Sequence, residues 1–195
     1  MVNPLREVLP EPLVPPRIRR RSRLLLARAR QNDNQMIRSI RYTPFYSFIK
    51  TLQYLLTGRL HFLKDQIGAV FSNERGQRFT VFRHMVVDPD QSQPSRVGAV
   101  FIAQFRVAGM SVRLNILFSW LPIPFYIGLP GFRSKRWMVD EERGVFAGYY
   151  KWDTQEMAEN YAGSYAAKFM TARSVPGTVN FQVYPRERAP APPSK

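Results

Sequence analysis

The chain has 195 residues, of which 45% are hydrophobic and 13% aromatic, so it can bury the core of one domain of ordinary size and is not disordered throughout. It contains no cysteine, which excludes a disulfide framework, a thiolate metal site and a cysteine nucleophile. Its formal net charge of +15 predicts attraction to anionic surfaces such as phospholipid, nucleic acid or an acidic partner.

The first 42 residues concentrate positive charge, with ten arginines against three acidic residues. Five prolines interrupt residues 1–16, so we expect no signal peptide there. We expect residues 1–42 to form a basic arm rich in proline and arginine, which is either a solvated tail or a tether to an anionic surface. The arginines that would bind this surface are Arg17, Arg19, Arg20, Arg21, Arg23, Arg28 and Arg30. Because no aromatic residue is interleaved with them, we do not expect nucleic acid as a partner.

An amphipathic helix is expected next, because apolar residues recur at spacings of three and four from Phe45 to Leu60, behind a proline in the first turn. We expect this helix to pack on its own domain. The alternative is a membrane surface, since Lys50, Arg59 and Lys64 fall among the apolar positions.

A β-hairpin should follow this helix. Residues 69–71 and 78–82 have strand character around a polar turn, and the second strand continues to Val87. The polar loop 91–95 marks the expected main boundary, so we take residues 43–95 as an extension of helix and hairpin ahead of the main domain.

Residues 96–186 carry the pattern of an α+β domain. Four alternating segments predict strands and two periodic segments predict helices, in the order βαββαβ. This order predicts a ferredoxin-like fold, in which two helices cover one face of a four-stranded antiparallel sheet. The expected elements are strand 97–107, helix 109–121, strands 132–139 and 145–152, a helix beginning at Asp153, and strand 179–184.

The first of these strands is apolar on both faces, so both faces should be covered. Its own helices would cover one face. We expect a second copy of the chain to cover the other, which gives a homodimer with sheet against sheet, a dimeric α/β-barrel.

The second predicted helix begins with Asp153 as N-cap and Glu156 in a capping box. A stripe of large residues at i+4 spacing then continues through Tyr161 to Phe169. We therefore expect one continuous helix, and we expect residues 187–195 to be a disordered, proline-rich tail.

The longest uncharged apolar run, residues 114–132, contains five prolines and glycines in its second half. A membrane-spanning helix seldom tolerates so many breakers, so we interpret this run as a buried or surface-docking segment. We expect a cytoplasmic protein, with peripheral association with a membrane as the alternative.

Three short motifs resemble the YdhR-like group of dimeric α/β-barrel proteins, whose members are described as monooxygenase-like: Gly128–Lys135 with Trp137, Gly148–Thr154, and Ser174–Gly177. The resemblance covers about the second half of the chain. It implies the ferredoxin-like fold, and a superfamily that includes cofactor-free quinone-forming monooxygenases and haem-degrading enzymes. Because this fold hosts many chemistries, the resemblance specifies activity far less than fold.

Signals of catalysis are few. The sequence contains no Gly-rich phosphate-binding loop, no Gly-x-Ser-x-Gly nucleophile elbow and no His-Glu-x-x-His zinc motif. The two histidines, His61 and His84, lie more than twenty positions apart without carboxylates at ligand spacing, so we expect no metal site and no cofactor. One histidine suffices to ligate haem, which stays an open alternative. The acidic cluster 140–142 is interpreted as a solvated hairpin turn.

Aromatic residues gather in the first predicted helix, the loop after it and the central hairpin. They are either core residues or the lining of a ligand pocket capped by the broken loop 122–131. The expected ligand-binding residues are Arg113, Phe125, Tyr126, Phe132, Trp137, Tyr149 and Trp152. The resemblance further implies that Asn115 positions oxygen and that Trp120 stacks on a phenolic substrate.

The sequence thus favours a protein that binds an aromatic or hydrophobic small molecule, with a cofactor-independent monooxygenase acting on a phenol or quinol as the enzymatic form. The alternative is a non-catalytic subunit, docked on a membrane or a larger complex through the basic arm.

Overall fold

One antiparallel sheet organises the part of the chain that the computed structural model describes, residues 39–73, 76–89 and 97–191. Within these ranges the strand order is β1-β3-β5-β6-β4-β7, and β2 pairs with the free part of β3. The strands are β1 (Leu60–Leu63), β2 (Val70–Ser72), β3 (Arg78–Val87), β4 (Ala99–Arg106), β5 (Phe132–Asp140), β6 (Val145–Trp152) and β7 (Asn180–Pro185).

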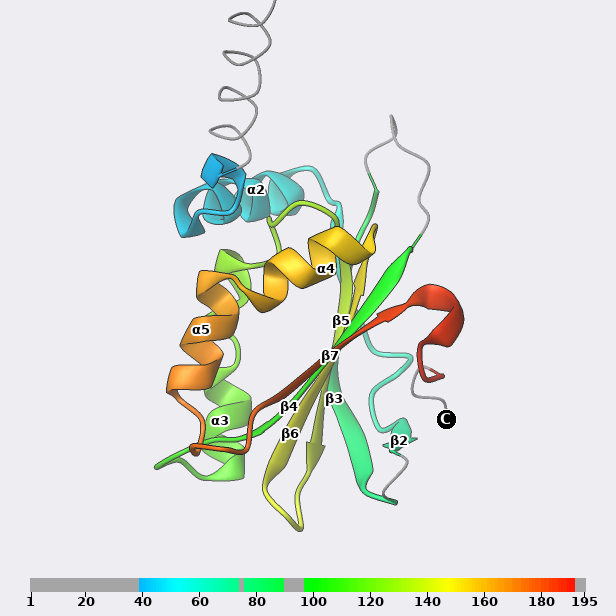
Figure 1. The fold of residues 1–195 in the computed structure, drawn as a ribbon. Coiled ribbons are helices and arrows are strands. Elements are labelled where there is room, and N and C mark those ends of the chain that lie inside the picture. The colour runs from blue at the N-terminus through cyan, green and yellow to red at the C-terminus, as the bar shows by residue number, and fades with distance from the viewer. Residues whose placement is uncertain (1–38, 74–75, 90–96, 192–195) are drawn as a thin grey trace, which may run out of the picture. The chain divides into compact units, whose positions relative to one another are not determined.

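The order β5-β6-β4-β7 is that of a ferredoxin-like sheet, so the predicted fold is confirmed. Helical segments cross over on one face of the sheet, whereas β2 and the C-terminal turn lie on the other (Figure 1). The helices are α2 (Pro44–Leu56), α3 (Val112–Phe118), α4 (Gln155–Ala162) and α5 (Tyr165–Ala172), with short 3-10 turns at Ile123–Phe125 (η1) and Arg186–Arg188 (η2). Over the described ranges, no helix is long and apolar enough to cross a membrane.

The predicted hairpin forms, and it joins the main sheet. Val70 pairs with Thr80, and β3 continues to Val87, as expected. β3 then pairs along β5, so the extension adds strands to the edge of the ferredoxin-like sheet. Leu60, which the helical pattern included, instead begins β1 and pairs with Val87.

Strand β4 is buried on both faces, as its composition predicts, but the cover of the second face differs from expectation. Val100 and Ile102 are buried there with Ala69, Phe71 and Ala189 of the same chain. The reason for postulating a second copy is therefore wrong, because β2 and η2 fold back onto this face. The homodimer itself stays a prediction.

The C-terminal helix is broken where one helix was expected. α4 ends at Gly163, and Ser164 caps α5 by accepting a hydrogen bond from the amide of Ala167. The start also differs by one residue, because Thr154 is the N-cap of α4. Asp153 instead forms a bidentate ion pair with Arg133 of β5, whose Nε and Nη2 donate to its two carboxylate oxygens.

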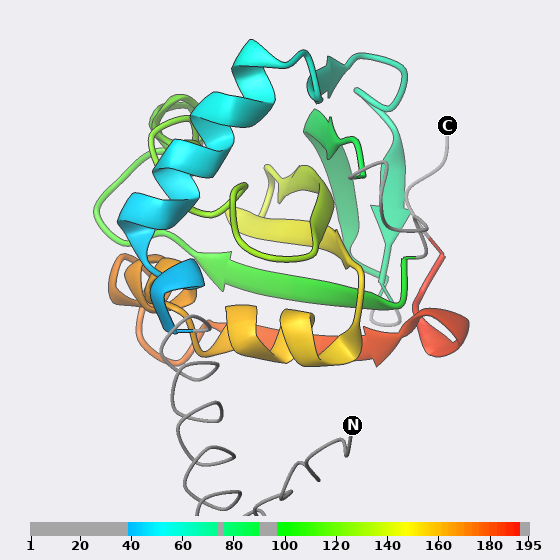
Figure 2. The same cartoon turned by 90° about the horizontal axis from the view of Figure 1, so that it is seen from above.

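Helix α2 begins as predicted, with Pro44 in the first turn behind the N-cap Thr43. Its orientation was not predicted: the small polar residues Ser47 and Thr51 are buried against the loop before β5, whereas the apolar side chains are exposed. Figure 2 shows α2 lying beside that loop, which contains η1. Gly128 permits the approach, because a Cβ there would overlap the carbonyl oxygen of Ser47.

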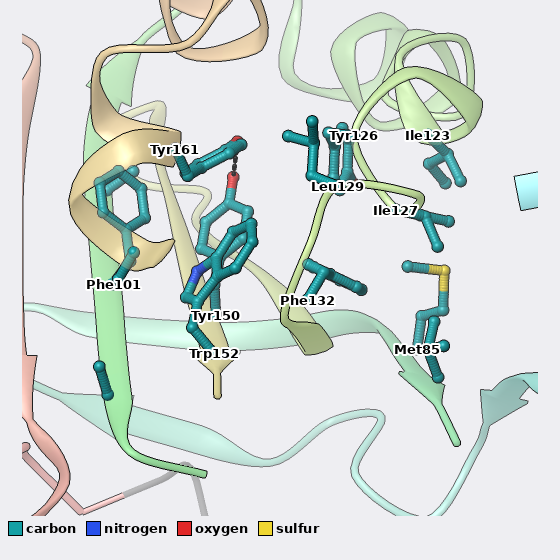
Figure 3. Packing of buried hydrophobic residues seen from close by; sticks show 14 of the residues in the cluster. Met85, Phe101, Ile123, Tyr126, Ile127, Leu129, Phe132, Tyr150, Trp152 and Tyr161 are labelled. Atoms are coloured by element: carbon teal, nitrogen blue, oxygen red, sulfur yellow. Dashed lines mark hydrogen bonds between the residues drawn. The ribbon is translucent and has the colours of Figure 1, made fainter. Parts of the chain in front are cut away.

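Between the sheet and the helices lies an aromatic core (Figure 3). Tyr161 of α4 packs on Phe101, Tyr150 and Trp152 with ring centroids 5.0 to 5.2 Å apart. Such tilted and edge-to-face pairs stabilise a core beyond simple burial of area. They fix the position of α4 above the sheet.

Candidate functional site

A cavity of about 80 Å³, which we call the inner cavity, lies between the sheet at β5 and β6 and the helices that cover it. Lys135 and Trp137 of β5 and Tyr150 of β6 contribute to its floor, because alternate strand residues face the helices. Asn115 and Tyr161 contribute from α3 and α4. Figure 3 shows the hydroxyl groups of Tyr150 and Tyr161 meeting at this level, 3.3 Å apart.

Lys135 is the most unusual group of this inner cavity. Its side chain is only 7% exposed, and its Nζ lies 4.3 Å from the ring centre of Trp137, 4.4 Å from that of Tyr150 and 4.7 Å from that of Tyr126. Nζ also donates a 3.3 Å hydrogen bond to the hydroxyl of Tyr126. Burial, with the nearby charge of Arg83, holds the pKa of Lys135 well below its usual value.

The inner cavity contains no acidic group. Its charged lining residues are Lys135 and Arg173, and no aspartate or glutamate lines it. No ion pair joins Lys135 to another described residue. A protonated Lys135 therefore has aromatic faces around it but no protein anion, and an anionic ligand would supply what is missing.

Asn115 brings a second polar group to the inner cavity. Ser111 caps the helix start by accepting from the amide of Leu114, which places Asn115 one turn later on the buried side of α3. Asn115 is 6% exposed and lines the inner cavity. Its amide can donate a hydrogen bond to a ligand there or accept one from it.

The three tyrosines that line the inner cavity, Tyr126, Tyr150 and Tyr161, are neutral hydroxyl groups at physiological pH. Burial raises the pKa of Tyr126 and of Tyr150 well above the usual value for tyrosine, and it also raises the pKa of Tyr161. They can donate or accept hydrogen bonds but do not supply the missing negative charge.

Arg83 of β3 does not line the inner cavity, but it contacts two residues that do, Ser119 and Trp137. Its guanidinium lies 3.7 Å from the ring centre of Trp120 and donates hydrogen bonds to Ser119 Oγ (2.7 Å) and Ile116 O (3.2 Å). Burial lowers its pKa to about 10, so it remains cationic at neutral pH. Its charge also disfavours a proton on Lys135.

A wider apolar groove of about 420 Å³ adjoins the inner cavity. Pro122, Ala166 and Phe169 line both, and Pro44, Leu121, Phe125 and Tyr165 complete the outer groove. The inner cavity alone is smaller than the ~150 Å³ that accommodates benzene in an engineered protein. A ligand with an aromatic head must therefore displace side chains or extend into the outer groove.

The structure brings only some of the predicted site residues together. Asn115, Tyr126 and Trp137 line the inner cavity, and Phe125 lines the outer groove. Phe132 and Trp152 are buried in the adjacent core, with ring centroids 5.4 Å apart, and line neither space.

Three further predicted residues lie elsewhere. Arg113 is exposed on α3, and Trp120 lies at the surface, where it covers Arg83 instead of facing the inner cavity. Tyr149 follows the alternation of β6 and faces the opposite side of the sheet, where its hydroxyl donates to Pro190 O. That contact also shows that the chain is folded onto the sheet at Pro190, within the tail expected to be disordered.

Sequence reasoning did not select Lys135, Tyr161 or Arg83. One signal was available: Lys135 lies two residues before Trp137 in a predicted strand, so both side chains face the same way. The predicted surface-binding arginines, Arg17 to Arg30, lie outside the described residues.

Neither histidine lies at the candidate site. His61 is exposed and hydrogen-bonded to Asp88, and His84 lies near Asp65, so neither histidine lines the inner cavity. No cluster of three potential ligands occurs in the described ranges. The inner cavity is also far too small for a porphyrin.

No protein-family model and no curated protein matches the chain. Several solved structures are similar to it. A ferredoxin-fold protein from Listeria monocytogenes, related to antibiotic biosynthesis monooxygenases, is 10% identical with a TM-score of 0.43, over 69% of this chain and 86% of that one. A heme-degrading enzyme from Listeria monocytogenes is 12% identical with a TM-score of 0.43, over 69% and 91%.

An anthrone oxidase-like protein is 19% identical with a TM-score of 0.41, over 56% of this chain and 54% of that one. At these identities and scores, the fold assignment rests on the strand order described above, and no activity is carried over. The YdhR-like assignment stays a prediction.

Proposed function

We propose that the chain binds an aromatic weak acid, a phenol or quinol, with its hydroxyl group against Lys135, and that it oxidises this compound without a cofactor. The observation that carries the proposal is a buried lysine between three aromatic rings in a cavity without a carboxylate. The rings suit an aromatic ligand, and the lysine suits an acidic one.

The lowered pKa of Lys135 favours a specific binding step. In the empty cavity its amine loses a proton more readily than an exposed lysine would, so it can accept one from a phenol. The transfer converts two neutral groups into an ammonium and a phenolate in contact. The pair then attracts strongly in the low dielectric of the interior, and this attraction offsets the cost of holding two charges away from water.

The amide of Asn115 is proposed to hold a second polar atom of the ligand. A quinol carries its second oxygen across the ring, and this oxygen needs a hydrogen-bond partner once it is buried. Asn115 lies on the helix side of the inner cavity, whereas Lys135 lies on the sheet side, so the two groups suit opposite ends of such a ring.

Oxidation follows from the charge of the bound ligand. A phenolate donates an electron to dioxygen more readily than the neutral phenol does, so no metal is required. In a phenol that carries hydrogen on the ring carbon opposite the hydroxyl, one oxygen atom of dioxygen forms a carbonyl at that carbon and the other leaves as water. The two hydrogens that the phenol loses, one from that carbon and one from the hydroxyl, supply the protons and electrons of the water. A quinol, which already carries oxygen at that carbon, instead transfers two hydrogens to dioxygen and gives a quinone and hydrogen peroxide.

Binding of 4-nitrophenol tests the proposal, because its phenolate is yellow and its neutral form is not. The wild-type protein should bind it and increase the phenolate absorbance below the pKa of the free compound. Lys135→Met should abolish that increase, and Lys168→Met, which changes an exposed lysine on α5, should not. Equal phenolate absorbance with wild type and Lys135→Met would refute the role of Lys135.

Oxygen uptake with 1-naphthol tests the enzymatic part. We expect consumption of dioxygen by the wild-type protein and a loss of about two orders of magnitude in Lys135→Met, a typical effect of removing a general base. Binding of 4-nitrophenol without any oxygen uptake would reject the oxygenase and retain the binding protein.

A further inference from the structure

The apolar side chains that the described chain exposes are concentrated in two segments. All of the large ones except Ile67 and Phe169 belong to residues 40–63 and 107–131. We call them together the apolar surface; its members are Ile40, Phe45, Phe48, Ile49, Leu52, Leu55, Leu56, Phe62, Leu63, Leu114, Leu117, Trp120, Leu121 and Phe125. Single exposed apolar residues are ordinary, but so large a group marks an interaction site.

The exposure of α2 is built into its docking. Thr51 donates a 2.9 Å hydrogen bond to Pro124 O, and Gly128 admits the backbone of α2 at Ser47. These contacts hold the small polar side of the helix against the protein. As a result Phe45 and Leu56, at its two ends, are 76% and 78% exposed. An amphipathic helix of a globular domain normally buries its apolar side instead.

The apolar surface reaches the mouth of the proposed site. The rings of Phe48 on α2 and Phe125 on η1 lie 5.9 Å apart, and those of Trp120 and Phe62 lie 5.2 Å apart. Phe125 and Leu121 also line the outer groove, which shares three residues with the inner cavity. Apolar side chains thus extend from α2 to the entrance of the cavity.

The charged residues within these two segments, Arg41, Lys50, Arg59 and Arg113, are all basic. Two exposed acidic residues, Asp65 and Asp88, border β1, and Asp88 is hydrogen-bonded to His61. An apolar face with a basic rim is the pattern of helices that lie in the interface of an anionic bilayer.

We propose that the apolar surface binds an anionic lipid bilayer, and that the outer groove passes a membrane-dissolved aromatic compound to the inner cavity. The second half of this proposal rests on the proposed function. α2 would lie in the interface with Phe45, Leu52 and Leu56 among the acyl chains. The groove, which opens among the same apolar side chains, then receives a ligand whose ring enters the cavity and whose hydrocarbon part stays in the groove.

Vesicle co-sedimentation of the full chain tests the surface. Wild type should bind vesicles of phosphatidylcholine with phosphatidylserine more tightly than vesicles of phosphatidylcholine alone. Leu52→Gln with Leu56→Gln should weaken binding by about tenfold or more, because two large apolar side chains no longer enter the bilayer. Lys50→Gln should weaken it about fivefold.

The matched control is Ile67→Gln, since Ile67 and Leu52 are both 44% exposed but Ile67 lies outside the apolar surface. Its affinity for vesicles should equal that of wild type. Equal binding by the double leucine variant would overturn the proposal. A second variant tests the basic arm, with Arg17, Arg19, Arg20, Arg21 and Arg23 all changed to Gln. If this variant loses binding to vesicles and the double leucine variant does not, the arm is the anchor and the proposal is wrong. A wild-type dimer that binds no vesicles and that the leucine variant dissociates would identify a second copy as the occupant.

Transfer of ligand is tested separately from binding in the cavity. Occupancy by 4-nonylphenol supplied in anionic vesicles should fall about tenfold in the double leucine variant. Occupancy by 4-nitrophenol supplied in water should not change, because Leu52 and Leu56 do not line the cavity. Equal uptake of 4-nonylphenol by both proteins would reject the transfer. If wild type binds vesicles but neither phenol, the proposed function fails and the bilayer surface stands.

Discussion

His84 should make the stability of the fold depend on pH in a calculable way. It lies on the sheet face opposite the helices and is 5% exposed. Burial, together with the positive charges of Arg136 and Lys151, lowers its pKa from 6.5 to about 4, although Asp65 at 3.6 Å opposes the shift. The folded protein therefore disfavours the protonated imidazole, whereas the unfolded chain protonates it near its ordinary pKa.

The sign and the size follow from linkage. Between the two pKa values the unfolded chain binds more protons, so acidification stabilises the unfolded state and the contribution of His84 to stability is lost as the pH falls from 6.5 toward 4. With these pKa values, the loss is about 2 kcal/mol between pH 7 and pH 5, and about 3 kcal/mol once pH 4 is reached.

Urea denaturation at a series of pH values measures this loss. Wild type should lose stability between pH 7 and pH 5, a range in which unpaired carboxylates remain ionised. In His84→Gln the same acidification should cost about 2 kcal/mol less. His61→Gln, which removes the other histidine, exposed on β1, is the control. If wild type and His84→Gln lose equal stability over this range, His84 is not buried as the structure describes.

Three further substitutions test the packing, each by urea denaturation at neutral pH. Lys135→Met should raise the free energy of unfolding by about 1–4 kcal/mol, because a buried amine without a counter-ion is replaced by an apolar side chain of similar length; a lower stability would contradict this. Gly128→Ala should cost about 1–3 kcal/mol through overlap with Ser47, whereas Gly163→Ala, whose new methyl would meet nothing closer than 3.9 Å, should cost less than Gly128→Ala. Thr154→Ala should lower the free energy of unfolding by about 1 kcal/mol, because the N-cap of α4 is lost. An unchanged stability would mean that Asp153, as first predicted, is the N-cap.

The strands were the predictable part of the fold. β6 was located to the residue, at 145–152, because a polar turn and a capped helix bound a run in which Lys151 is the one charged residue. The hairpin of β2 and β3 followed from the same local signals. Local sequence patterns do not show which distant segments will cover a face of the sheet. The packing of Ala69 and Ala189 onto the face of β4 opposite the helices was therefore not predicted.

Helix breaks and orientations were less predictable for a related reason. The i+4 spacing of Tyr161 and Tyr165 continues across Gly163, although the chain turns there and a second cap begins. The pattern of α2 identified its apolar side but not the direction that side faces. That direction depends on Pro124 and Gly128, which are far away in sequence.

The sequence predicted an aromatic pocket, but it did not predict Lys135, the central residue of the candidate site. An aromatic pocket under the broken loop was expected, and Asn115, Tyr126 and Trp137 do line it. Lys135 was passed over because a lysine in a strand is ordinarily solvated. Its burial arises from three rings that only the folded chain brings together.

Nitrogen-15 NMR of the Lys135 side chain, with and without 4-nitrophenol, is the most direct test of the site. The amine of the free protein should lose its proton at a pH well below the usual pKa of lysine, because it is buried without an anion. On binding, its signal should move to that of an ammonium while the ligand becomes phenolate. A Lys135 that keeps the usual pKa of lysine and does not respond to the ligand would contradict the account.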